Sequence, residues 1–198
     1  HEKSRWPLTW TAALKRVARA SPTLIIKQSH SYLENELELK DMIGSGLSEQ
    51  DLAELRQALQ DVVPIKYKGL AAKERKLTYA QCVYLLSVYH LERFRAICCV
   101  DESEPGGLEA ILEYAEAGEG RGGGDTHMLV EGIMSKVLES FFEAAEAAPC
   151  SKRRDQGLQD QVCGLLYDVA SRVGPRRIAA DRALKLLLRR FPQLHWNR

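Results

Sequence analysis

The stretch of residues 77–98 reads LTYAQCVYLLSVYHLERFRAIC, and it decides the fold class of the chain. Thr78 and Gln81 have the spacing of a capping box, in which the two side chains satisfy free amide groups of the first helical turn. The residues behind them are apolar on nearly all sides of a helix as far as Val88. A helix of this kind is usually buried in the centre of a packed array. We therefore predict a central helix over residues 79–98.

The last part of this helix is amphipathic. Leu91 and Phe94 fall on one side of a helix, since they are three residues apart. The charged side chains of the same segment are expected to face away from these two, toward solvent: Glu92, Arg93 and Arg95.

Helical signals continue through the rest of the chain. Apolar residues recur at intervals of three and four, and Ser, Thr, Gly and Pro mark the ends of the segments. This spacing predicts further helices over residues 8–20, 24–43, 49–63, 108–117, 125–148, 158–173 and 176–190. We find no convincing strand and expect an all-α protein.

The order of these helices predicts their arrangement. A train of helices joined by short turns suits a stacked helical array of the HEAT or armadillo kind, that is, an α-solenoid. A closed helical bundle is the competing architecture. We interpret residues 1–198 as a single α-helical solenoid segment with flexible loops near 64–76 and 118–125. The first loop is basic, and the second contains five glycines within residues 118–124.

The last two predicted helices have apolar faces. In the first of them, four side chains are expected to point inward: Val162, Leu165, Leu166 and Val169. In the last helix one face is apolar and the opposite face is basic, with Leu184, Leu187, Leu188 and Phe191 on the former and Arg182, Lys185 and Arg189 on the latter. The end of a cut solenoid lacks its covering neighbour. We therefore expect this apolar face to be exposed and to drive self-association, whereas in a complete domain Leu187 would belong to the core.

Composition excludes several classes of protein. The chain has 28 Lys and Arg against 27 Asp and Glu, a net charge of +1, so the basic excess of a nucleic-acid binder is missing. No stretch approaches the roughly 20 apolar residues of a membrane span, and the N-terminus lacks the pattern of a secretory signal. The five cysteines are an odd number without zinc-site spacing, which favours reduced, buried thiols in a cytosolic protein.

Motifs for catalysis or cofactor binding are also missing. The histidines are scattered, whereas a metal site needs clustered ligands, so we expect no metal. There is no G-x-S-x-G nucleophile motif. The glycine-rich residues 120–124 lack the Gly-Lys-Ser/Thr ending of a phosphate-binding loop. We assign no catalytic or cofactor-binding residue, and a small helical enzyme with a site assembled from distant residues stays as an alternative.

Two groups of basic residues are candidate contacts for an anionic partner. Each group contains neighbouring Lys or Arg residues, and the five residues are Lys152, Arg153, Arg154, Arg176 and Arg177. They suit contact with anionic lipid or an acidic protein. The competing interpretation is that each group decorates the end of a helix.

The C-terminal segment carries a family resemblance. Residues 174–184 read GPRRIAADRAL, and residues 190–196 read RFPQLHW. The combination of a basic, apolar, alanine and aspartate stretch with a later Phe-Pro, leucine and Trp resembles the helical solenoid region of the type III phosphatidylinositol 4-kinase alpha family. Residues 77–89 and 31–36 are compatible with the same family.

The resemblance implies a specific context. The family phosphorylates the 4-position of phosphatidylinositol with ATP and Mg in a C-terminal kinase domain, whose catalytic loop and Asp-Phe-Gly motif have no match here. Its solenoid docks a tetratricopeptide-repeat adaptor and hyccin, and through them a palmitoylated membrane anchor. The resemblance thus implies a non-catalytic scaffold segment, cytoplasmic and recruited to the plasma membrane, in a parent protein that can form a homodimer. A HEAT-like adaptor or transport scaffold unrelated to a kinase is the alternative.

Overall fold

Every regular element described is a helix, as expected. The computed structural model describes residues 8–25, 49–63, 77, 79–101, 108–117 and 125–195. Within these ranges there are no strands, and the elements are α1 (Leu8–Ala20), α3 (Glu49–Val62), α5 (Tyr79–Asp101), α6 (Glu109–Ala117), α7 (Asp125–Ala147), α8 (Lys152–Val169), α9 (Gly174–Arg190) and the 3₁₀ turn η2 (Pro192–His195). The all-α prediction is confirmed. Most of the helix predicted over residues 24–43, together with Thr78 and the loops at 64–76 and 118–124, lies outside the described residues.

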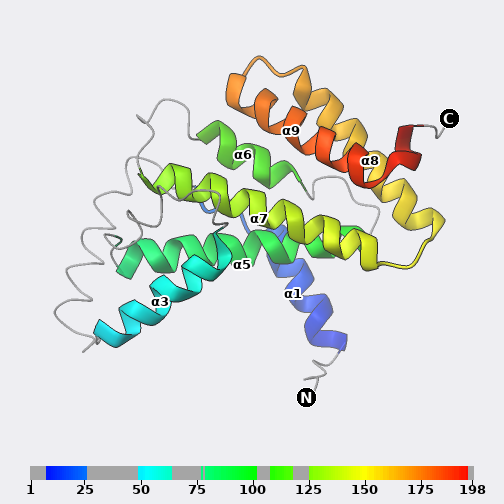
Figure 1. Ribbon diagram of the computed structural model, residues 1–198. Coiled ribbons are helices and arrows are strands. Elements are labelled where there is room, and N and C mark those ends of the chain that lie inside the picture. The colour runs from blue at the N-terminus through cyan, green and yellow to red at the C-terminus, as the bar shows by residue number, and fades with distance from the viewer. Residues whose placement is uncertain are drawn as a thin grey trace.

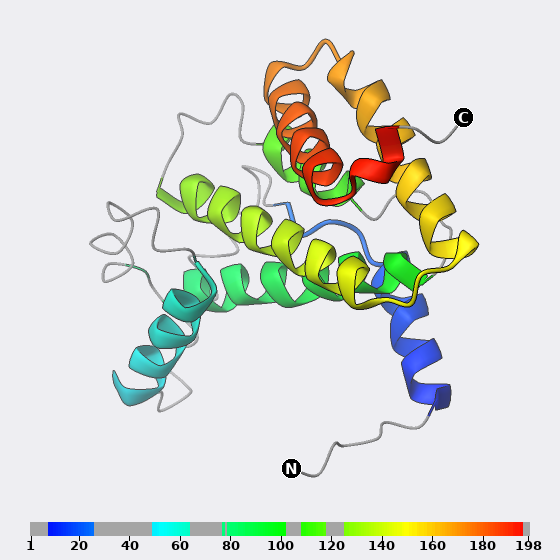
Figure 2. The same ribbon diagram turned by 45° about the vertical axis from the view of Figure 1, so that its right-hand side comes forward.

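The helices form an array around two long central members. α5 and α7 run side by side in the same direction, and they make the most extensive contact between any two described helices (Figure 1). α1 and α3 pack against α5, while α6 and α9 lie on the other side of the array and α8 pairs with α9 (Figure 2). α5 is the predicted central helix, because Leu85, Val88 and Ala96 have no exposed surface.

Local signals explain where the last two helices begin. The Ser151 side chain accepts a hydrogen bond from the backbone amide of Arg154 (3.1 Å), which satisfies a free donor at the start of α8. Pro175 occupies the first turn of α9, where its missing N–H costs nothing. Arg189 and Arg190 lie in the last turn of α9, a position that suits the helix dipole.

Two expectations about inward and outward faces were wrong. Glu92 and Arg95 do not face solvent, since their side chains are only 1% and 11% exposed; α1, the segment after it and α6 cover this part of α5. Leu166 was expected inward but is 53% exposed, whereas Leu158 and Leu165 of the same helix are buried. α8 packs against α9 and α5, and Leu166 lies on the side of α8 that is left open to solvent.

The expectation of an exposed apolar end at α9 was also wrong. Leu187 has no exposed surface, and Leu184 and Phe191 are buried. This face of α9 is covered by α6, by α8 and by η2, which folds back against the helix. Leu187 is therefore part of the core. The basic face behaves as predicted, because Arg182, Lys185 and Arg189 are all exposed.

The cysteines divide into two kinds. Of the four cysteines whose surroundings the structure describes, Cys82 and Cys98 are buried in α5, as expected, whereas Cys150 and Cys163 are exposed, against the expectation of buried thiols. None of the described helices combines the length and the apolar character that crossing a membrane requires.

Candidate functional site

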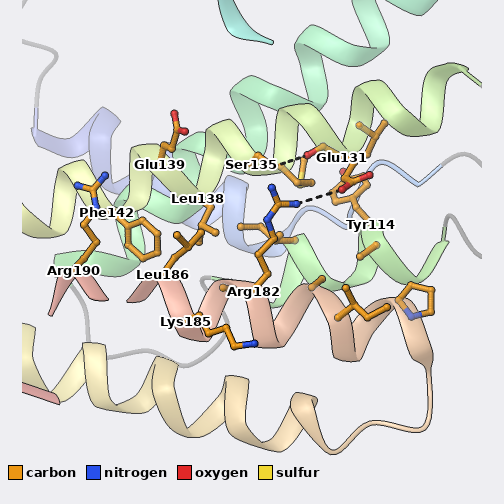
Figure 3. Close-up of a pocket in the computed structure, with 18 of the residues that line it drawn as sticks. Tyr114, Glu131, Ser135, Leu138, Glu139, Phe142, Arg182, Lys185, Leu186 and Arg190 are labelled. Atoms are coloured by element: carbon orange, nitrogen blue, oxygen red, sulfur yellow. Dashed lines mark hydrogen bonds and ion pairs between the residues drawn. The ribbon is translucent and has the colours of Figure 1, made fainter. Parts of the chain in front are cut away.

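A groove of about 700 Å³ lies between α7 and α9. α6 lies between these two helices (Figure 1) and supplies the floor through Ile111, Tyr114 and Ala115. The walls are largely apolar. Figure 3 shows Leu138 of α7 and Leu186 of α9 pointing into the space between their helices.

The groove is elongated. On α9 its lining extends from Pro175 to Arg190, and on α7 it extends from Val130 to Phe142. At 1.5 Å per helical residue these spans correspond to about 22 Å and 18 Å. The shape is therefore a channel several helical turns long and not a compact cavity for a small ligand.

The two walls have opposite charge. α7 carries five acidic side chains and one lysine, while α9 carries six basic side chains and one aspartate. The acidic wall contributes Glu131 and Glu139 to the groove, and the basic wall contributes Arg182, Lys185 and Arg189. The groove therefore combines an apolar floor with an acidic edge on α7 and a basic edge on α9.

Ion pairs join the two walls. Arg182 Nη1 lies 3.4 Å from Glu131 Oε1, and this pair is visible at the mouth of the groove in Figure 3. Arg190 Nη1 lies 2.8 Å from Glu146 Oε1, with its guanidinium 5.9 Å from the centre of the Phe142 ring. The hydrogen bond and charge of Glu146 raise the pKa of Arg190.

A buried polar network holds the floor of the groove in place. Tyr114, which is 3% exposed, donates from its hydroxyl to Glu92 Oε1 (3.2 Å) and accepts from the backbone amide of Leu24 (2.7 Å). Arg95 Nη1 donates to both oxygens of Glu92, at 2.9 and 3.1 Å. α6 is thereby fixed to α5, and the groove floor has a defined position.

The same network anchors the segment that follows α1, residues 21–25, which we call the N-terminal connector. Arg95 donates to the backbone carbonyls of Ala18 (2.6 Å), Ser21 and Pro22 (3.1 Å). Two further hydrogen bonds fix the connector: Tyr84 Oη donates to the Leu24 carbonyl (2.8 Å), and Thr23 Oγ1 donates to Glu113 Oε2 (2.7 Å). Side chains of α5 and α6 therefore satisfy the backbone of the connector.

Burial dominates the electrostatics of this network. It raises the pKa of Glu92, although the charge of Arg95 and the hydrogen bonds from Tyr114 and Arg95 oppose the shift. Burial, followed by the nearby charge of Glu92, also raises the pKa of Tyr114. Tyr114 therefore stays protonated and keeps its role as donor to Glu92.

The basic residues singled out from the sequence do not form one patch. Arg154 donates hydrogen bonds to Asp155 (2.9 Å) and to the Ala148 carbonyl (3.1 Å) within the protein. Lys152 and Arg153 are exposed at the start of α8. Arg154 and Asp168, which marks the other end of α8, are separated by about 21 Å of helix.

The second basic group lies at that other end. Arg176 Nε donates to Asp168 Oδ1 (2.8 Å), and Arg176 Nη1 lies 3.3 Å from Glu116 Oε2 of α6, so this side chain joins three helices. The Asp168 hydrogen bond raises the pKa of Arg176. Arg177 is exposed. Whether Lys152, Arg153 and Arg177 contact an anionic partner stays a prediction.

Two further features of the described part of the chain concern its chemistry: the grouping of side chains that can ligate a metal ion and the carboxyl group whose pKa is shifted. Among the described residues, no group of three or more His, Cys, Asp and Glu side chains has the proximity that a metal ion needs. The perturbed carboxyl group, Glu92, faces Arg95 and Tyr114 inside the fold and not the solvent.

A family model described as the PI4-kinase N-terminal region matches residues 3–198. The chain belongs to this family. The match covers the C-terminal segment whose resemblance to phosphatidylinositol 4-kinases was noted above, and it also covers all the described helices. The all-α array is thus the fold of a PI4-kinase N-terminal region.

The groove of this PI4-kinase N-terminal region was not identified from the sequence. Its lining comes from α6, α7 and α9, and residues from three helices give no common motif. Two signals were nevertheless present. The segments that form α7 and α9 carry opposite net charge, and Ile178 is an apolar residue directly after two arginines.

Proposed function

We propose that this PI4-kinase N-terminal region is a non-catalytic helical scaffold that joins a phosphatidylinositol 4-kinase to adaptor subunits. The observation that supports the proposal best is the groove between α7 and α9, which is apolar, open and edged by charge. Surfaces of this composition are typical of protein recognition. The family context supports a link to a lipid kinase.

The proposal includes the partners and the place of action. The partners are a tetratricopeptide-repeat adaptor, hyccin and, through them, a palmitoylated membrane anchor that recruits the cytoplasmic assembly to the plasma membrane. Homodimerisation of the parent kinase is a further part of the proposal. ATP and Mg belong to the kinase domain of the parent, and this segment uses no cofactor.

Co-purification tests the scaffold role. The chain is mixed with the adaptor and hyccin and separated by size-exclusion chromatography at micromolar concentration. We expect the three proteins to elute together and ahead of the chain alone. Separate elution at every concentration tested would contradict the proposal.

Titration with ATP-Mg in a calorimeter tests the absence of catalysis. The chain should release no saturable heat, and it should form no phosphatidylinositol 4-phosphate from phosphatidylinositol vesicles. Saturable ATP binding would instead favour a helical enzyme with its site assembled from distant residues.

A further inference from the structure

We propose that the groove between α7 and α9 binds one amphipathic helix of a partner protein, with an acidic flank against α9 and a basic flank against α7. The inference rests on the proposed scaffold role and specifies the chemistry of the docked element. It is argued from the length of the groove, from its apolar lining and from the opposite charges of its walls.

The length of the groove selects a helix. Its walls extend about 18 to 22 Å, which matches three to four turns of a partner helix at 5.4 Å per turn. A helix presents apolar side chains at i, i+3 or i+4 and i+7 along one ridge, and this ridge is the element that enters grooves of this kind. Met134 lies in the wall, and its flexible side chain can adjust to the anchors that enter.

The charges of the walls specify the flanks. Arg182, Lys185 and Arg189 on α9 are exposed and favour carboxylates on the adjacent flank of the partner. Glu131 and Glu139 on α7 pair within the protein with Arg182 (3.4 Å) and Lys136 (3.2 Å), and their exposed carboxylates favour lysine or arginine on the other flank of the partner. A partner helix with one sign of charge on both flanks would be attracted to one wall and repelled by the other.

The ion pairs across the groove do not block the partner. Arg182 and Glu131 are both exposed, as are Arg190 and Glu146. Exposed pairs contribute little to stability because solvent screens them. The partner's flanks offer each of these residues a replacement of the required sign.

Direction of binding follows from the same charges. Reversing a helix in the groove exchanges the walls that its two flanks face. A helix with one acidic and one basic flank therefore fits in one direction only. Exchanging its two flanks should reverse the direction without abolishing binding.

Fluorescent peptides of about 18 residues test the proposal by anisotropy. All have the same leucine ridge. One has Glu along one flank and Lys along the other, and the two controls have Glu on both flanks or Lys on both. We expect the mixed peptide to bind about tenfold more tightly than either control at low salt, with the advantage shrinking as salt is added. Equal affinity of the three peptides would overturn the proposal.

Two matched variants locate the binding site. Leu186→Glu places a charge in the groove wall, whereas Leu166→Glu places the same charge on the exposed face of α8. Leu186→Glu should weaken binding of the mixed peptide by about tenfold or more, and Leu166→Glu should leave it nearly unchanged. Circular dichroism checks that both variants stay folded. Unchanged affinity of folded Leu186→Glu would show that the groove is not the site.

Reversing the charge of one wall adds a further test. Its expected result is a changed preference among the peptides, which unfolding of the variant cannot produce. The triple variant Arg182→Glu, Lys185→Glu and Arg189→Glu makes the exposed edge of α9 acidic, with three glutamates beside the remaining Arg190. This variant should bind the peptide with lysine on both flanks more tightly than it binds the mixed peptide. A preference that stays with the mixed peptide would contradict the assigned roles of the walls.

A photocrosslinker at the N-terminus of the mixed peptide reports direction. It should label one end of the groove, near Ile178 or near Phe142, and exchanging the two flanks should move the label to the other end. Labelling of both ends by both peptides would contradict the charge argument.

Three outcomes separate this inference from its alternatives. If sedimentation shows a dimer of the chain that Leu186→Glu dissociates, the groove takes a second copy and the proposal is overturned. If the adaptor co-purifies equally well with the parent and with Leu186→Glu, the adaptor docks elsewhere. The scaffold role then stands without the groove. If the mixed peptide binds and the adaptor does not, the groove inference stands and the scaffold proposal fails.

Discussion

Arg95 and Glu92, one turn apart on α5, form an ion pair with 2.9 Å between Nη1 and Oε1, although both side chains lie inside the fold. The pair is tolerated there because its remaining groups have partners. The other nitrogens of Arg95 donate hydrogen bonds to three backbone carbonyls, the last of which is that of Pro22. Glu92 accepts a hydrogen bond from the Tyr114 hydroxyl. Removing the two charges from water costs much of the free energy that their attraction provides. A buried ion pair of this kind therefore serves mainly to position the segments that it joins.

Replacement of Arg95 by lysine should destabilise the protein. Lysine keeps the charge but cannot donate from a planar fork to the carboxylate and to three carbonyls together. We expect a loss of about 3 kcal/mol in the free energy of unfolding, measured by urea denaturation. The matched control is Arg93→Lys, because Arg93 is exposed on the same helix and its replacement should change stability by less than about 0.5 kcal/mol. Equal effects of the two changes would contradict the positioning role.

Glu92 should give the protein a specific pH dependence. Its pKa in the folded state is raised above the ordinary value of 4.5, so in the pH range just above 4.5 the folded state binds more protons than the unfolded state. The free energy of unfolding contributed by this group therefore falls as pH rises through that range. Glu92→Gln cannot titrate, and the stability advantage of the parent over this variant should shrink as pH rises from 4.5.

Urea denaturation of both proteins at a series of pH values measures this difference. The groups common to both proteins cancel in the comparison. An advantage that instead grows with pH would mean that Arg95 outweighs burial and lowers the pKa of Glu92.

The same substitution at two leucines should separate core from surface. Leu187→Asp places a carboxylate where no surface is exposed and should cost about 3–5 kcal/mol, a large part of the stability of an ordinary domain. Leu166→Asp, on the exposed face of α8, should cost less than about 0.5 kcal/mol. Thermal melts measure both. A folded Leu187→Asp variant with higher solubility would restore the exposed-end hypothesis.

Two neighbouring arginines on α9 should likewise differ. Arg176 joins α9 to Asp168 of α8 and Glu116 of α6, and Arg176→Ala should cost about 1–2 kcal/mol. Arg177 is exposed, so Arg177→Ala should be nearly neutral. Chemical denaturation compares them. If vesicles containing anionic lipid bind the parent, Arg177→Ala should weaken that binding more than Arg176→Ala, since only Arg177 has an accessible charge.

Gly164 is a position where the sequence is not optimal for stability. It lies within α8, and a Cβ atom added there would have no atom within 4 Å beyond its chain neighbours and the adjoining backbone of its own helix. Gly164→Ala should therefore raise the free energy of unfolding by about 0.5–1 kcal/mol, because glycine loses more conformational freedom in a helix. Gly164→Pro serves as the opposite control and should destabilise, since it breaks a helical hydrogen bond. A melting temperature that falls for both variants would contradict the conclusion that there is open space beside Gly164.

The fold class could be predicted from the sequence because local signals determine it. The central position of α5 follows from its apolar run, and the basic face of α9 follows from Arg182, Lys185 and Arg189 at helical spacing. These features depend only on which side of one helix a residue occupies. They need no knowledge of the neighbours.

The candidate site could not be predicted in this way, because it depends on neighbours. Glu92 and Arg95 have the pattern of a solvated face, and α1, the connector and α6 bury them. Leu166 has the spacing of an inward residue, but α9 covers the adjacent face of α8. The groove exists because α6 lies between α7 and α9, an arrangement that no single helix encodes.

The connector has a consequence for the order of events during synthesis. Thr23 binds Glu113, 90 residues later in the chain, and Leu24 binds Tyr114 at the same separation. At roughly 5 to 20 residues per second on the ribosome, about 5 to 20 s pass before these partners have been made. α1 leaves the ribosome before the other described helices, yet the segment after it cannot complete its native contacts until α6 has been made. A nascent chain stopped before residue 113 would therefore present α1 and the connector to proteases and chaperones, and a chain stopped beyond α6 would protect them.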